Sequence, residues 1–226
     1  MVKKTVNRRG LHAKFRKTAL TKAQKSSVKK IAQKVVNKNA EWKRRLDYSS
    51  GVGMTSLTGH VLFDGPQIVV GDGAEQRDGL TVMLRKLRFK LQCAYKGIPT
   101  KVRLIGARYP QGSSSPSLSD LLTHPTATQA FYSPWLKAGP VKYDIFCNKT
   151  VNLGGEAEMA GTYKEKYLNF DIKLKGAGQK LTYEDGTTQT PDKNRYVLYA
   201  VPNYIPAIAT DRPIISHFVE TSFTDM

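Results

Sequence analysis

The sequence predicts an all-β fold, an antiparallel sandwich of jelly-roll type that follows a basic N-terminal arm and one helix. Short extended segments bounded by Gly, Pro, Asn and Asp follow one another from residue 48 to the end of the 226-residue chain. Helical periodicity is confined to the residues before 47, apart from a short segment at 117–124. No strand–helix–strand rhythm occurs, which argues against a parallel sheet.

The arm differs from the rest of the chain in charge. The chain carries 36 Lys and Arg against 18 Asp and Glu, a formal charge of +18. Residues 1–46 contain 16 of the cations and one acid, Glu41, so residues 47–226 are nearly neutral. Such asymmetry is typical of a chain with a polyanion partner, most often nucleic acid. A solvated tail and an anionic membrane surface are the alternatives.

Within the arm we expect two segments, followed by the body at 47–226. Residues 1–20 contain too few apolar side chains to offset the loss of chain entropy, so they are expected to be disordered. Residues 21–46 have the pattern of an amphipathic helix that begins at a capping box of Thr21 and Gln24. Its apolar stripe consists of Val28, Ile31, Val35, Trp42 and Leu46. This stripe either packs on the body of its own chain or packs on symmetry-related copies.

The body contains seven candidate strand regions. In residues 80–95 the alternation changes phase at Arg85-Lys86, which predicts a bulge in a long strand. The short helix at 117–124 has Ser117 as its expected cap. The candidate regions are 57–70 (two runs broken at 64–66), 80–95, 101–109, 141–153, 167–175, 195–201 and 213–223.

Patterns of catalysis and metal binding are absent from the sequence. None of the four histidines, His12, His60, His124 and His217, has a second ligand at metal-binding spacing. No nucleophile elbow or phosphate-binding loop is present, so we expect no enzyme, no metal and no cofactor. Cys93 and Cys147 are expected to be reduced thiols. No apolar run is long enough for membrane insertion.

One region of the sequence carries a family resemblance. It has an aliphatic pair at 69–70, then Gly71-Asp72, Gln76-Arg77 and Gly79, and then the long basic strand at 80–95. A strand with arginines at 101–109, a short helix at 118–122 and an aromatic patch at 131–135 follow in order. This pattern resembles the single-jelly-roll coat proteins of the satellite tobacco necrosis virus type, which also occur in small circular single-stranded DNA viruses.

The resemblance implies an eight-stranded jelly roll that self-assembles into a T=1 icosahedral shell of sixty copies. It also implies a viral capsid protein of the virion, present in the host cytoplasm or nucleus during assembly. The implied partners are other copies of the chain and a single-stranded genome; the sequence does not identify a host receptor. A cellular nucleic-acid-binding β-sandwich that forms no shell is the main alternative. A carbohydrate-binding jelly roll that stacks Phe131, Tyr132 and Trp135 on sugar is another.

The predicted functional residues form three sets. The cations of the arm and helix are expected to bind nucleic acid: Lys3, Lys4, Arg8, Arg9, Lys14, Arg16, Lys17, Lys22, Lys25, Lys29, Lys30, Lys34, Lys38, Lys43, Arg44 and Arg45. Four cations of the long strand face either the inner surface of a shell or solvent: Arg85, Lys86, Arg88 and Lys90. The expected subunit interface consists of the helix stripe Val28, Ile31, Val35, Trp42 and Leu46, together with Arg77.

Overall fold

The structure is a computed structural model that describes residues 20–39, 41–96, 100–110, 117–126, 129–136, 139, 142–154, 163–174 and 178–225. The chain divides into two units, residues 1–40 and residues 41–226. The arm expected to be disordered, residues 1–20, lies outside the described residues except for Leu20.

The first unit contains helix α1, Lys22–Asn39. The predicted capping box forms: the Thr21 N–H donates to Gln24 Oε1 at 2.9 Å, and the Gln24 N–H donates to Thr21 Oγ1 at 3.2 Å. The prediction that the helix extends to residue 46 is wrong, because β1 begins at Lys43 and pairs with β9. Sheet hydrogen bonding overrides the weak helical pattern of these residues. Trp42 and Leu46 therefore do not belong to the helix stripe.

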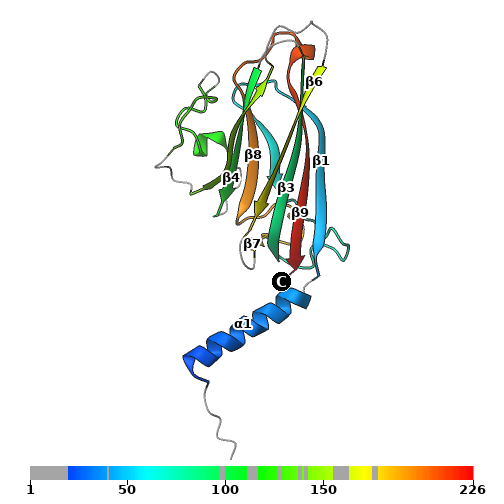
Figure 1. The fold of residues 1–226 in the computed structure, drawn as a ribbon, viewed down its shortest axis with the longest axis vertical. Coiled ribbons are helices and arrows are strands. Elements are labelled where there is room, and N and C mark those ends of the chain that lie inside the picture. Colours follow the sequence, from blue (N-terminus) through cyan, green and yellow to red (C-terminus); the bar gives the residue numbers. More distant parts are fainter. Residues whose placement is uncertain are drawn as a thin grey trace, which may run out of the picture. The chain divides into compact units, whose positions relative to one another are not determined.

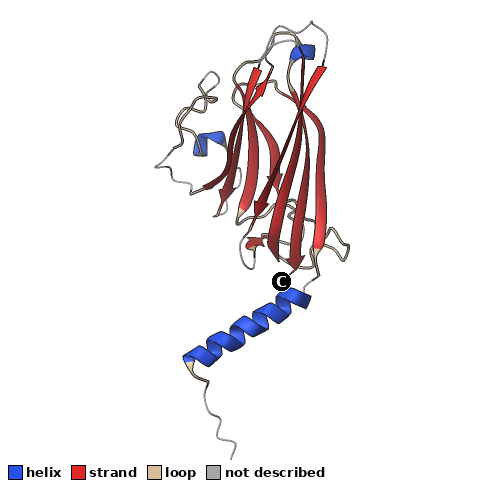
Figure 2. Ribbon diagram, in the orientation of Figure 1, coloured by secondary structure: helices blue, strands red, loops and turns tan. Residues whose placement is uncertain are grey.

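The second unit is a sandwich of two antiparallel sheets (Figures 1 and 2). One sheet has the order β1-β9-β3-β6, and β7 also pairs with β3; the other has the order β2-β8-β4-β5. The strands are β1 (Lys43–Gly53), β2 (His60–Gly65), β3 (Thr81–Lys96), β4 (Thr100–Tyr109), β5 (Asp144–Leu153), β6 (Tyr163–Lys173), β7 (Gln179–Thr182), β8 (Arg195–Pro202) and β9 (Ile214–Asp225). The predicted all-β sandwich is confirmed.

The core lies between the two sheets. Phe89 of β3 is fully buried and packs edge-on against Phe63 and in a stack against Phe170. Burial of each such side chain contributes on the order of 2 kcal/mol. The register of β3 against β9 shifts between Leu84 and Lys86, which confirms the predicted bulge and keeps side chains on both sides of the shift in the core.

The outer faces of the two sheets differ. Residues 117–126 and 129–136 contribute apolar side chains, Leu121 and Phe131 among them, that pack against Ile105 and Tyr199 of the four-stranded sheet. Within that cover the predicted helix is shorter than expected, a single 3-10 turn η1 at Leu118–Asp120. No described segment of residues 41–226 covers the outer face of the five-stranded sheet in this way.

Candidate nucleic-acid interface

Helix α1 combines a cationic face with an exposed apolar stripe. Lys22, Lys25, Lys29 and Lys30 are exposed, and the first turn of the helix contains no acid. Val28, Ile31 and Val35 are 52%, 62% and 53% exposed. In proteins, most of the stability of a helix such as α1 comes from packing of its apolar face. The stripe is therefore the part of α1 that a partner surface would bury.

Part of the predicted nucleic-acid-binding set lies outside the described residues and side chains. Lys34 and Lys38 belong to α1, but their side chains lie outside the described ones. The arm cations all lie outside the described residues: Lys3, Lys4, Arg8, Arg9, Lys14, Arg16 and Lys17.

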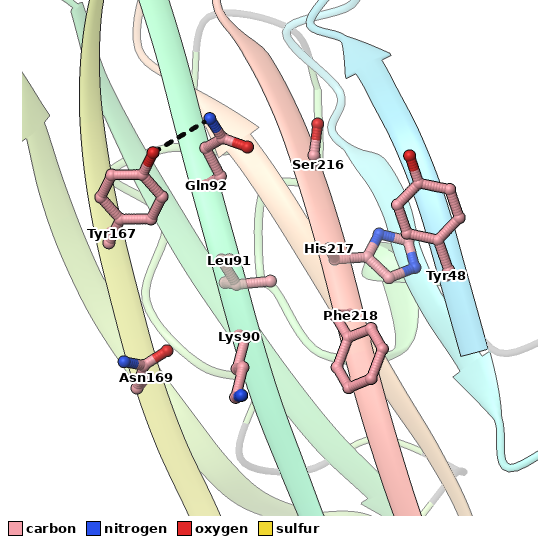
Figure 3. A pocket seen from close by; sticks show the side chains of 9 residues that line it. All are labelled: Tyr48, Lys90, Leu91, Gln92, Tyr167, Asn169, Ser216, His217 and Phe218. Atoms are coloured by element: carbon pink, nitrogen blue, oxygen red, sulfur yellow. Dashed lines mark hydrogen bonds between the residues drawn. The ribbon is translucent and has the colours of Figure 1, made fainter. Parts of the chain in front are cut away.

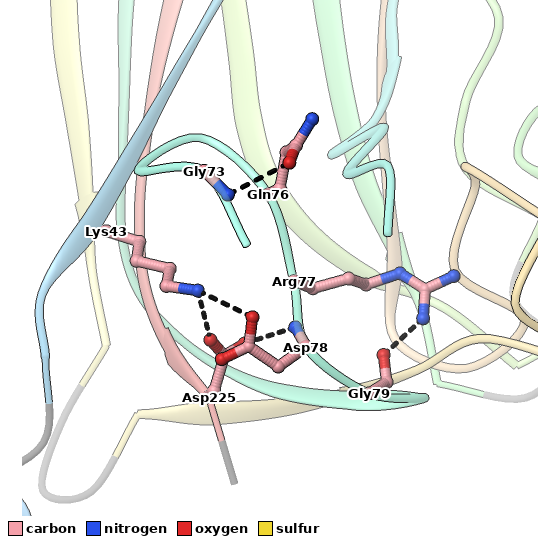
Figure 4. Close-up of polar contacts among 7 residues, drawn as sticks. All are labelled: Lys43, Gly73, Gln76, Arg77, Asp78, Gly79 and Asp225. Carbon is pink, nitrogen blue, oxygen red and sulfur yellow. Dashed lines mark hydrogen bonds and ion pairs between the residues drawn. The ribbon is translucent and has the colours of Figure 1, made fainter. Parts of the chain in front are cut away.

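The three cations at the start of β1 differ from one another. Lys43 is only 3% exposed, and its Nζ lies 3.0 Å from Asp78 Oδ1 and 2.7 Å from Asp225 Oδ2 (Figure 4). The prediction that Lys43 contacts nucleic acid is therefore wrong, because its ammonium is enclosed by carboxylates. Arg45 pairs with Asp47 at 2.9 Å, and Arg44 is exposed on the outer face of the sheet.

The titration of the Lys43 cluster reflects this geometry. Burial lowers the pKa of Lys43, but the hydrogen bonds and charges of Asp225 and Asp78 outweigh it, so the pKa is raised above 10.5. The hydrogen bond from Lys43, followed by that with Asp225, lowers the pKa of Asp78 below 3.8.

Arg77 has an internal role, so its predicted place at a subunit interface is wrong. Its side chain is fully buried and lies over the ring of Tyr183, with the guanidinium carbon 4.0 Å from the ring centroid. The guanidinium donates to four backbone carbonyls, those of Ile68 (3.0 Å), Gly79 (Figure 4), Asp185 (2.9 Å) and Thr188 (2.8 Å). It therefore joins the loop before β3 to the loop after β7.

The four cations of β3 lie in different surroundings. Lys86 Nζ lies 2.7 Å from Asp171, and Arg88 pairs with Asp171 and with Glu220 at 3.2 Å each. Arg85, at the bulge, lies over the ring of Trp42 at 5.8 Å and donates to Thr224 Oγ1 at 3.3 Å. Lys90 is exposed, and its Nζ lies 5.7 Å from the ring centroid of Phe218. Whether these four face the inside of a shell stays a prediction.

The outer face of the five-stranded sheet has an open pocket of about 450 Å³ (Figure 3). The strand register places its side chains in two rows. Tyr48, Phe218, Lys90 and Asn169 form one row across β1, β9, β3 and β6, and Ser216, Gln92 and Tyr167 form the next. Leu91 and His217 complete the lining.

Hydrogen bonds position part of this pocket. Gln92 Nε2 donates to Tyr167 Oη at 3.3 Å (Figure 3), and the Tyr167 hydroxyl donates to the carboxylate of Glu165. His217 is 8% exposed, and its buried Nδ1 has no hydrogen-bond partner in the described part of the chain. Burial lowers the pKa of His217, so its ring is neutral at pH 7.

Sequence reasoning missed the tyrosines of this pocket. The alternation within each strand predicts which face of β1 carries Tyr48 and which face of β6 carries Tyr167. The sequence could therefore have indicated that each tyrosine lies on the polar face of its strand. These two faces belong to the same side of one sheet only because of the strand order, and no local pattern in the sequence encodes that order.

The aromatic patch at 131–135 lies beside the other sheet. Phe131 is buried, whereas Tyr132 is 74% exposed. Arg103 of β4 donates to the carbonyls of Phe131 and Ser133 at 3.1 and 2.7 Å, and its guanidinium lies over Trp135 at 5.0 Å. The patch is thereby attached to β4; sugar stacking there stays a prediction.

The described residues contain neither a candidate metal site nor a candidate membrane-spanning helix. They contain no group of three or more His, Cys, Asp or Glu side chains placed to hold a metal ion. Nor do they include a helix with the length and apolar character needed to span a bilayer. Cys93 and Cys147 are both buried and free, and burial raises the pKa of each thiol to about 11.

Comparisons with known proteins include a distant structural likeness. No protein-family model matches the chain, and no curated protein matches it. Among solved structures, the chain is similar to a chain from the structure of infectious bursal disease virus, Gx strain, with 9% identity and a TM-score of 0.30. The match covers 82% of this chain and 33% of that one, so this chain spans about a third of its length. A likeness of this strength carries no weight for fold or function.

Proposed function

We propose that the chain is a viral capsid protein that self-assembles into a T=1 icosahedral shell of sixty copies. The shell packages a single-stranded genome through the basic arm and helix, and it has no enzymatic activity. In this proposal the protein resides in the virion. The sequence at residues 69–95 resembles this class of protein, and three further observations support the proposal.

The strand order is the observation that carries the proposal. If the four-residue β7 is set aside, eight strands remain in two sheets of four. Counted along the chain, their orders are 1-8-3-6 and 2-7-4-5, which favours a jelly roll. Viral capsid proteins are one of the main classes built on this fold, along with lectins and cupins.

The separation of charge supports genome packaging over the other jelly-roll functions. Residues 1–40 contain 13 Lys and Arg and no Asp or Glu, whereas the cations at 43 and 45 pair with acids of the body. Sixty copies would bring roughly 780 positive charges to one interior, at a scale of one charge for each phosphate. These cations contact phosphate rather than base edges, so packaging by the arm is tolerant of sequence.

The helix stripe supports self-assembly. Val28, Ile31 and Val35 are exposed within their own unit, although burial of each would stabilise the helix by roughly 1.5–3 kcal/mol. Symmetry-related copies can bury the same stripe together, which requires no additional partner.

Analytical ultracentrifugation of protein stripped of nucleic acid tests this proposal. At low salt, repulsion between the arms opposes closure, so we expect small oligomers. A short single strand of almost any sequence should then produce uniform closed particles, which negative-stain microscopy would show. Removal of residues 1–20, which deletes seven cations, should leave the sandwich folded and lower the nucleic acid content of each particle.

Two outcomes would contradict the proposal. Complexes of one or a few chains per strand, with no large species under any condition, would favour a cellular nucleic-acid-binding protein. Particles that form with only one sequence would contradict packaging by charge and would require base-specific contacts.

A further inference from the structure

We propose that the outer face of the five-stranded sheet binds the bases of single-stranded nucleic acid. The rings of Tyr48, Phe218 and Tyr167 are the stacking surfaces, and Lys90 contacts phosphate. This inference rests on the proposed function, since it assigns to the folded body a second mode of binding the same genome.

The exposure of the two tyrosines is the first reason. Tyr48 is 71% exposed and Tyr167 is 65% exposed, on a face that no described segment of residues 41–226 covers. Two tyrosines associated with the four-stranded sheet, Tyr109 and Tyr199, are at most 2% exposed. The fold thus buries these two rings of the four-stranded sheet, whereas it presents Tyr48 and Tyr167 to solvent. Exposed aromatic rings at a sheet face are the surfaces on which unstacked bases pack.

The remaining chemistry of the pocket fits a nucleotide. The nine lining residues include one cation, Lys90, and no carboxylate. Asn169 shares the row of Lys90, and Gln92 lies beside it along β3, so two amides that can pair with base edges lie near the ammonium. A purely apolar partner would bury the Lys90 ammonium and the Asn169 amide without hydrogen-bond partners, at a cost in free energy.

The spacing fits a short single strand rather than one base. β1 and β6 are separated by three strand intervals of about 4.8 Å each, roughly 14 Å in all. Tyr48 and Tyr167 at the two sides therefore stack on different bases. RNA-recognition modules bind two or three bases on an open four-stranded sheet in this way.

The position of the acids sets the path of the sugar-phosphate chain. Glu165 lies one row beyond Tyr167, on the side away from the row of Lys90 and Asn169. The row on the other side of Lys90 also contains two carboxylates, Glu220 and Asp171, but these pair with Arg88 and Lys86. Phosphate is repelled by Glu165 and attracted to Lys90, so the chain follows the row of Lys90.

The test is binding of an eight-nucleotide fluorescent thymidine strand to the full chain in 1 M salt, where a Debye length of about 3 Å weakens the contribution of the arm. An abasic strand of equal length carries the same phosphates without bases. The variants are Tyr48→Ala, Tyr167→Ala and the corresponding Phe replacements. Tyr132→Ala is the matched control, because Tyr132 is equally exposed but lies in the patch beside the other sheet. Circular dichroism verifies that each variant is folded.

We expect the wild-type chain to bind the thymidine strand on the order of tenfold or more tightly than the abasic strand, since loss of one stacked base has about this effect. Each Tyr→Ala change should weaken thymidine binding by a similar factor, and Tyr→Phe should retain it. Tyr132→Ala should bind like the wild type. Photocrosslinking of a 5-bromouridine strand inside assembled particles should label peptides of β1 and β6.

Three results would overturn the inference. They are equal binding of the abasic strand, unchanged thymidine binding in both Ala variants, and crosslinks confined to the arm and α1. Altered sedimentation of Tyr48→Ala with normal thymidine binding would instead identify this face as a contact between copies of the chain. The two binding measurements do not depend on particle formation, so the inference can fail while the capsid proposal stands.

Discussion

Cations occupy opposite surroundings in the two units of this molecule. On α1 the lysines at 22, 25, 29 and 30 are exposed, and residues 1–40 contain no acid to pair with them. In the sandwich, Lys43 is enclosed by two carboxylates and Arg77 by four carbonyls. The comparison shows that an excess of Lys and Arg predicts binding of a polyanion only where the fold leaves those side chains without internal partners.

The largest expected effect comes from Arg77→Ala. The change leaves four carbonyls without their donor and opens a cavity beside Tyr183, so we expect a loss of about 4 kcal/mol in unfolding free energy. Urea titration of the variant measures this loss. Arg77→Lys should restore little of it, because one ammonium cannot reach all four carbonyls.

Arg44→Ala, at an exposed position, is the control and should change stability by less than about 0.5 kcal/mol. If Arg77→Ala has normal stability but fails to assemble, the result would support a role of Arg77 at the subunit interface.

Val35→Asp tests the other unit at its apolar stripe. If copies of α1 bury this stripe together, the unpaired charge costs roughly 3–5 kcal/mol at each site, and assembly should fail or become heterogeneous. The urea midpoint of the sandwich should not change, since Val35 lies outside that unit. Ser26→Asp places the same charge on the opposite face of the helix and should assemble normally. Normal particles from Val35→Asp would show that the stripe has no partner.

A double charge reversal on the helix should have a smaller, electrostatic effect. Lys29→Glu with Lys30→Glu should reduce packaged nucleic acid. It should also lower the salt dependence of single-strand binding by about 0.7 for each phosphate that the helix no longer neutralises. The matched control reverses Lys101 and Lys142, two exposed lysines of the sandwich, and should change packaging less. The absorbance ratio of purified particles measures the outcome, and an equal reduction in both variants would contradict the special role of α1.

The smallest expected effect concerns acid stability of the Lys43 cluster. The folded-state pKa of Asp78 is depressed below 3.8 by its hydrogen bond with Lys43. The ionised Asp78 therefore contributes to stability above about pH 4. This contribution is lost as the pH falls through the depressed folded-state pKa of Asp78. Asp78→Asn should flatten the fall in melting temperature between about pH 5 and about pH 2. Lys43→Met should remove the same dependence, and an unchanged slope in both variants would contradict this assignment.

Much of the fold could be predicted from local patterns. Alternation located the strands, the change of phase at 85–86 placed the bulge, and the spacing of Thr21 and Gln24 marked the start of α1. Each of these signals depends on residues adjacent in sequence or one turn apart. The charge division between the arm and the body is likewise a property of composition alone.

The functional surfaces depended on pairing between distant residues. The helix ends at Asn39 because residues 43–53 pair with β9, which is more than 160 residues away in sequence. Arg77 is internal because loops more than 100 residues further along the chain provide carbonyls for its guanidinium. Tyr48 and Tyr167 share one face only because β9 and β3 lie between their strands. Local sequence established which residues could form strands, a helix and a cationic arm. Tertiary packing selected the side chains that remained free to bind, because the burial of a side chain depends on the segments that pack around it.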